Sequence, residues 1–102
     1  MKLTDIFAHE ADGIYEARTN AYQVVAVTNH FGKTLLNITF EFYRVHTTLV
    51  GGIPARNGWH ERPMARKVVD KKPCNTFVLT PKDAMRTKAF AEIRECEWTQ
   101  VL

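Results

Sequence analysis

The chain has 102 residues, of which 45% are hydrophobic and 25% are charged, and this composition predicts one globular domain with a real core rather than a disordered chain. No apolar run reaches the roughly 18 residues that a membrane span needs, and the lack of serine excludes the serine hydrolases. The two cysteines, Cys74 and Cys96, are too few for a disulfide framework, although the sequence leaves a single bridge open. We therefore expect a soluble, cytoplasmic protein with no membrane partner.

The net charge of +3 is unevenly distributed along the chain. Residues 51–72 hold six cations against two acids, whereas the remaining residues hold eight cations against nine acids. The basic character is therefore local. A local basic segment suits either the phosphates of a nucleic acid or an acidic protein surface.

A short helix is predicted near the beginning of the chain. The side chain of Thr4 or Asp5 supplies an oxygen that can cap it, and Gly13 gives it a place to end. Residues 14–18 then alternate weakly between apolar and polar side chains, which predicts a first strand.

Two longer strands joined by a hairpin are predicted next. Residues 22–28 are rich in β-branched and aromatic side chains, and their apolar run predicts burial on both faces at the strand's centre. Residues 29–33 have the length and the glycine of a hairpin loop. Residues 34–44 alternate most regularly, so this strand is predicted to organise the domain. The side chains expected on its buried face are Leu36, Ile38, Phe40 and Phe42.

The middle of the chain is predicted to leave the regular sheet. Residues 45–50 continue the extended pattern less clearly, and Gly51-Gly52 interrupts it. Residues 53–63 contain two prolines and an Asn-Gly pair, which predict an irregular loop. Residues 64–70 are predicted to return as a short edge strand, ended by Lys71-Lys72-Pro73, residue types that protect sheet edges from pairing.

The C-terminal part is predicted to form a strand followed by a helix. Residues 74–80 have a strand composition, and Thr80 with the following proline marks a helix start, so one helix is expected over 81–95. The stripe expected on the sheet is Met85, Ala89, Phe90 and Ile93. Residues 98–102 are expected to form a last strand or to pack under the helix. The predicted fold class is α+β, with a small antiparallel β-sheet of four to six strands, a C-terminal α-helix packed on one face and a short N-terminal helix.

No motif in the sequence defines a reaction or a cofactor. The four histidines, His9, His30, His46 and His60, are not close to one another along the chain. A zinc site would need His46 and His60 to converge with both cysteines without any short-spaced pair of ligands. We therefore predict that the protein is not an enzyme and has no metal or cofactor. A small-molecule or catalytic site that uses His30, His46 or His60 at a loop rim is the least favoured alternative.

The basic loop over residues 51–72 is the predicted partner-binding region. It interleaves cations with an indole, and the candidate residues are Arg56, Asn57, Trp59, His60, Arg62, Arg66 and Lys67. Tryptophan and arginine are the residue types most enriched at protein interface hot spots. The same set suits phosphate contact with stacking on an unpaired base. The structural alternative is that Trp59 packs back on the sheet and the cations are merely solvated.

Three functional interpretations follow in order. The first is a small non-enzymatic module that docks on a partner protein through this loop and an adjacent sheet edge. In size and in its lack of motifs the chain resembles the accessory inhibitors that phages encode, and this resemblance implies inhibition by docking. The second is a nucleic-acid-binding protein that uses the same loop, and the third is the histidine site. Pairing between sheet edges also leaves a homodimer open.

Overall fold

The computed structural model describes the backbone of residues 1–102 except 51–52, 56–57 and 61–63, and describes side chains outside 49–64. Its elements are α1 (Leu3–Phe7), β1 (Ile14–Arg18), β2 (Tyr22–Phe31), β3 (Thr34–Val50), β4 (Ile53–Ala55), β5 (Gly58–His60), β6 (Met64–Val69), β7 (Asn75–Leu79), α2 (Pro81–Arg86), the 3-10 turn η1 (Lys88–Phe90), α3 (Ala91–Glu95) and β8 (Thr99–Gln100). The α+β class with an antiparallel sheet, predicted from the sequence, is confirmed. Among the described residues, none of the helices has the length and apolar character needed to cross a bilayer.

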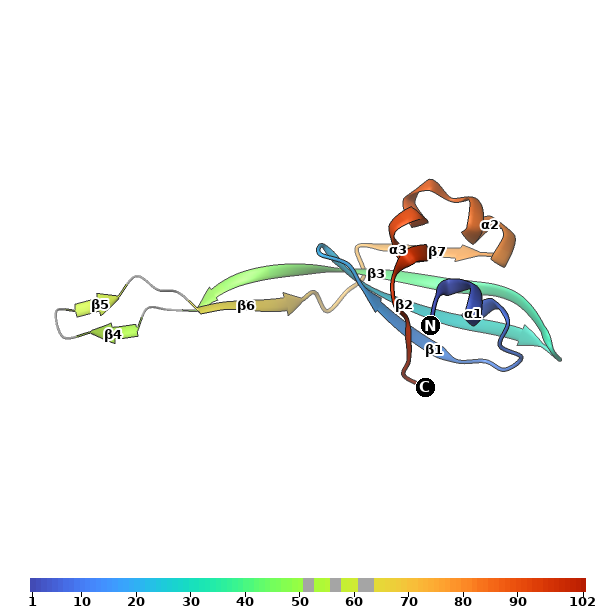
Figure 1. Ribbon diagram of the computed structural model, residues 1–102, viewed down its shortest axis with the longest axis horizontal. Helices are drawn as coiled ribbons and strands as arrows, with labels where there is room; N and C mark the ends of the chain where they lie inside the picture. The colour runs from blue at the N-terminus through green and yellow to red at the C-terminus, as the bar shows by residue number, and fades with distance from the viewer. Residues whose placement is uncertain (51–52, 56–57, 61–63) are drawn as a thin grey trace.

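The strand β3 organises a six-stranded antiparallel sheet that curls into a half-barrel (Figure 1). The order is β6-β3-β2-β1-β8, and β7 also pairs with β3. β2 lies along one edge of residues 34–44. On the other edge, β7 pairs with residues 38–42 and β6 pairs with residues 45–50. The strand predicted over 34–44 therefore continues to Val50, well beyond the rest of the sheet.

A two-residue turn, rather than the predicted loop over 29–33, joins β2 to β3. Phe31 pairs with Thr34, so only Gly32 and Lys33 connect the strands. Gly32 has a φ of 64°, whereas no described non-glycine residue has a positive φ. This pattern matches the type II′ hairpin turn, in which the first central residue needs the left-handed region.

A β-bulge in the same hairpin corrects the prediction for Leu36. Asn29 pairs with Asn37, but the next residue, His30, pairs with Leu35, so Leu36 is the extra residue on β3. A single extra residue reverses the faces of the side chains beyond it. Leu36 is consequently 45% exposed, and Leu35 packs against the core in its place.

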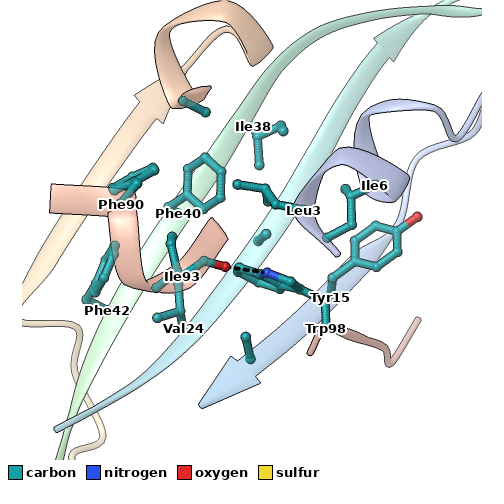
Figure 2. Close-up of a cluster of buried hydrophobic side chains, with 13 residues drawn as sticks. Leu3, Ile6, Tyr15, Val24, Ile38, Phe40, Phe42, Phe90, Ile93 and Trp98 are labelled. Carbon is teal, nitrogen blue, oxygen red and sulfur yellow. Dashed lines mark hydrogen bonds between the residues drawn. The ribbon is translucent and has the colours of Figure 1, made fainter. Parts of the chain in front are cut away.

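The core lies between the concave face of the sheet and the helices (Figure 2). Ile38, Phe40 and Phe42 are buried as predicted. The Phe90 ring contacts three aromatic rings of the sheet, with centroids 4.7 Å from Phe40, 5.6 Å from Phe42 and 5.3 Å from Phe77. Trp98, which was predicted to join a last strand or to pack under the helix, is buried. It donates its indole N–H to the Ile93 carbonyl over 2.9 Å. Residues 99–100 after it form β8.

The single helix predicted over 81–95 is divided into three pieces. Thr87 adopts an extended conformation (φ −71°, ψ 121°), and the Arg94 guanidinium donates to the carbonyls of Ala84 and Thr87 at this break. The buried residues are Ala84, Phe90 and Ile93, whereas Met85 is 42% exposed. Ala89, also predicted to lie on the sheet, is exposed as well.

The N-terminal helix is confirmed but is shorter than predicted and begins earlier. It follows Lys2, whose backbone N–H donates to the Asp5 carboxylate over 2.7 Å, so Asp5 stabilises the first turn from inside the helix. The helix ends at Phe7, well before Gly13. Gly13 is instead hydrogen-bonded to β2: its N–H donates to the buried Thr28 hydroxyl over 2.8 Å.

β2 is buried on one face only, which corrects the prediction of burial on both. Val24, Ala26 and Thr28 are buried, whereas Val25 and Val27 between them are half-buried. The helices contribute their buried side chains to the same face of the sheet as Val24 and Ala26.

Candidate partner-binding surface

β3 and β6 continue beyond the core as a two-stranded ribbon, here called the arm, which consists of residues 45–50 and 64–69 (Figure 1). The ladder runs in register from Val45 opposite Val69 to Val50 opposite Met64. The molecule measures 66 × 26 × 22 Å with a radius of gyration of 18.2 Å, against about 13 Å for a compact domain of this length. The arm thus gives the protein an elongated shape.

A small hairpin, rather than a fully irregular loop, lies within the predicted loop over 53–63. β4 and β5 pair antiparallel, with Ile53 opposite His60, Pro54 opposite Trp59 and Ala55 opposite Gly58. Proline is tolerated in such a ladder because each strand of a two-stranded hairpin has a free edge that can take the residue without an N–H. The prediction that irregular structure takes up most of this segment was wrong.

The predicted partner-binding residues fall into three groups. Arg56, Asn57 and Arg62 lie outside the described residues. Trp59 and His60 belong to the backbone of β5, but their side chains are outside the described set, so the packing predicted as an alternative for Trp59 stays a prediction. The other two candidates, Arg66 and Lys67, are described and are exposed on β6.

Arg66 and Lys67 lie on opposite faces of the arm. Successive side chains of a strand alternate between faces, and the two residues pair with Thr48 and Thr47 of β3, respectively. Both threonines are exposed. Each face of the arm therefore presents a long cation beside a short hydroxyl side chain.

The base of the arm contains a contact between His46 and Asp70 that the sequence did not predict. His46 Nε2 lies 2.9 Å from Asp70 Oδ1, with both side chains nearly half exposed. The Asp70 N–H donates to the Arg44 carbonyl over 3.0 Å and extends the ladder by one residue. The pairing of 45–50 with 64–69 would have revealed this contact, but the separation of these strands in the sequence conceals their register.

A two-lysine loop projects from the sheet edge between β6 and β7. Val69 pairs with Val45 and Asn75 pairs with Phe42, so five residues of the edge stand opposite two of β3. Lys71-Lys72-Pro73 form this extra length and are exposed. Their location agrees with the edge-protecting role predicted from the sequence.

His30 is held in the structure by both ring nitrogens. Nδ1 lies 3.0 Å from the Asp12 carboxylate and Nε2 lies 2.8 Å from the His9 carbonyl, and the side chain is only 3% exposed. Both partners are acceptors, so each ring nitrogen has an acceptor within hydrogen-bonding distance. With neither nitrogen free, His30 is a structural residue, which weakens the histidine-site interpretation.

Acidification should weaken this contact through Asp12. The hydrogen bond from the His30 ring, together with that from its backbone N–H, lowers the pKa of Asp12 below its usual 3.8. A carboxyl whose pKa is lower in the folded state stabilises the fold above its unfolded pKa and loses this contribution as pH falls through the folded pKa. We expect Asp12→Asn to make the free energy of unfolding, measured in urea between about pH 5 and 2, fall less steeply with acidification. Glu10→Gln on the same connection is the control, and an equal change in both variants would contradict the assignment.

The remaining chemistry-bearing groups are dispersed. Both cysteines are free, with Cys74 exposed and Cys96 half-buried, so the structure has no bridge between them. Burial raises the pKa of the Cys96 thiol. Within the described part of the chain, no three His, Cys, Asp or Glu side chains gather as metal ligands. Two open pockets, of about 320 and 280 Å³, contain no histidine or cysteine among their lining residues.

Comparison of this chain with protein-family models, with curated proteins and with solved structures finds no match.

Proposed function

We propose that this protein is a small non-enzymatic module that binds an acidic surface of a partner protein through its arm. The observation that supports this most directly is that the arm extends beyond the core and that none of its described side chains is among the buried residues. An isolated two-stranded ribbon is at best marginally stable in water. A ribbon whose described side chains are exposed or half-buried gains stability if another molecule supplies the missing contacts.

The charge of the arm and its base supports an acidic partner. Five cations lie there against one carboxylate, that of Asp70; the five are Arg44, Arg66, Lys67, Lys71 and Lys72. None of them forms an ion pair with another described residue. A positive projection of this kind accelerates the encounter with an acidic surface and gives the contact its specificity. An inhibitory outcome, as the resemblance to phage accessory inhibitors implies, requires that the partner use the covered surface.

Reversal of the two arm cations tests this proposal. We expect Arg66→Glu with Lys67→Glu to reduce partner capture from nuclease-treated lysate by at least about tenfold, because like charges across an interface are repulsive. The control is Lys82→Glu with Lys88→Glu, which reverses two exposed cations on the helices and should leave capture unchanged. Equal capture by the arm variant and the wild type would overturn the proposal.

Nucleic-acid binding is the second candidate, because the major groove of DNA admits a two-stranded β-ribbon and the arm has a cation on each face. This candidate predicts that nuclease treatment abolishes capture. It also predicts that affinity for an oligonucleotide falls steeply with salt. The absence of any mobility shift of DNA or RNA at low salt would remove it.

A further inference from the structure

The two edges of the arm differ in how well they are protected against pairing. The β6 edge carries Arg66 and Lys67 and ends in the projecting loop Lys71-Lys72-Pro73. Lysine, proline and local bulges are the usual devices that keep an edge strand from pairing. The β3 edge of the arm has His46, Thr47 and Thr48, with no lysine or proline among them. Only one edge of the arm is therefore open to another strand.

The directions of the backbone N–H and C=O groups on the open edge follow from the neighbouring hydrogen bonds. The Val45 N–H donates to the Ala21 carbonyl over 2.9 Å, so it points toward the β2 side of β3. Because a strand alternates the direction of its N–H and C=O groups, those of Thr47 and Leu49 point to the same side. β2 begins at Tyr22, which lies opposite Arg44. On the β2 side of β3, no described strand pairs with the residues that follow Arg44. These two residues thus present unpaired donors and acceptors in line with β2.

We infer that this edge of β3 binds an extended, acidic segment of the partner protein, which adds to the arm as a third strand in line with β2. The inference rests on the proposed function and names the mode of binding. Strand addition uses main-chain hydrogen bonds for affinity and side chains for specificity. A third strand also converts a marginal ribbon into a more stable sheet.

The acidic character of the segment follows from the side chains next to the edge. An added strand would lie about 10 Å from β6, which is two strand spacings. Arg66 and Lys67 lie opposite Thr48 and Thr47, so their long side chains can extend past these short ones toward the added strand. Carboxylates on both faces of the added strand would pair with these cations. A second copy of this chain would instead bring two basic arms together, which disfavours a homodimer at this edge.

Substitution by proline distinguishes the two edges. Thr47→Pro removes an N–H that points away from β6, so the β3–β6 ladder keeps its hydrogen bonds while the open edge is blocked. Ala65→Pro is the matched control. The Asp70 N–H donates toward β3, so by alternation the N–H of Ala65 points to the outer, protected edge of β6.

The probe is a nine-residue synthetic peptide of Glu, Thr and Val with carboxylates on both faces of its extended form. We expect it to shift the amide resonances of Thr47 and Leu49 and to slow their hydrogen exchange. Thr47→Pro should weaken its binding about tenfold or more, the equivalent of one hydrogen bond or slightly more, and Ala65→Pro less than about twofold. Lysine in place of glutamate should abolish binding.

Three results would overturn the inference: equal binding by the Thr47→Pro variant, no binding of the acidic peptide at low salt, or an oligonucleotide that shifts these amides when the peptide does not. The outcome is separable from that of the proposed function. Partner capture that requires Arg66 and Lys67 but tolerates Thr47→Pro would refute strand addition and leave the protein-binding role intact. Capture that is unchanged when the charges of the arm are reversed would refute the protein-binding role.

Discussion

Replacing Phe40 with alanine is expected to lower the free energy of unfolding by about 3–5 kcal/mol, the usual cost of truncating a fully buried phenylalanine. Phe40 has no exposed surface and lies in the centre of the sheet. The centroid of its ring lies 4.7 Å from that of Phe90 in the helical layer and 6.4 Å from that of Trp98 (Figure 2). Truncation therefore leaves a cavity between the two layers, and the loss is measured by urea unfolding monitored by circular dichroism.

Leu36→Ala is the matched control on the same strand. Because the bulge exposes this side chain, its truncation should change the free energy of unfolding by no more than about 0.5 kcal/mol. A cost similar to that of Phe40→Ala would mean that Leu36 is buried as its position in the alternation suggests. It would therefore contradict the register of the β2–β3 hairpin.

The contrast between these residues also explains what the sequence can predict. Period-2 alternation correctly placed Ile38, Phe40 and Phe42 in the core because burial of one face is a local property of a regular strand. The bulge at Leu36 depends on how β3 aligns with β2, and nothing in the strand's own sequence reveals that register. The prediction for Leu36 is therefore wrong because its burial depends on strand pairing and not on the local alternation.

The divided C-terminal helix has a similar cause. In one continuous helix, Ala84 and Phe90 are six residues apart and lie on different sides of the axis, yet both are buried. The extended conformation at Thr87 reorients the chain so that both reach the same sheet. The three aromatic rings around Phe90 supply burial that outweighs the continuous helical hydrogen bonding favoured by the local sequence.

The arm was predictable only in part. The edge strand over 64–70 and its protecting lysines follow from composition, and the structure has them. The extension of β3 to Val50 and the opposite directions of Arg66 and Lys67 depend on their pairing. Within the basic segment, residues 64–69 form a strand of the arm, and its two cations lie on opposite faces.

Excision of residues 47–67, which form most of the arm and the β4–β5 hairpin between its strands, should abolish partner binding without unfolding the protein. His46 and Val68 are opposite each other in the ladder, so residues 47–67 can be replaced by Asn-Gly, the pair that favours a two-residue hairpin turn. None of the described side chains of the excised segment, those of residues 47–48 and 65–67, belongs to the buried core. A shorter surface connection also has a slightly smaller loop-closure cost, so the free energy of unfolding should change by less than about 1 kcal/mol. Partner capture should fall by at least about a hundredfold, since interface energy concentrates in a few central residues.

The two measurements on this variant separate three explanations of the arm. A folded variant without capture assigns binding to residues 47–67, because the described side chains of this segment contribute nothing to the core. A folded variant that still captures the partner would move the site to the body and contradict the proposed function. An unfolded variant would mean that the ribbon stabilises the body. The arm would then be explained by its contribution to folding, and its marginal stability would no longer support a role in binding.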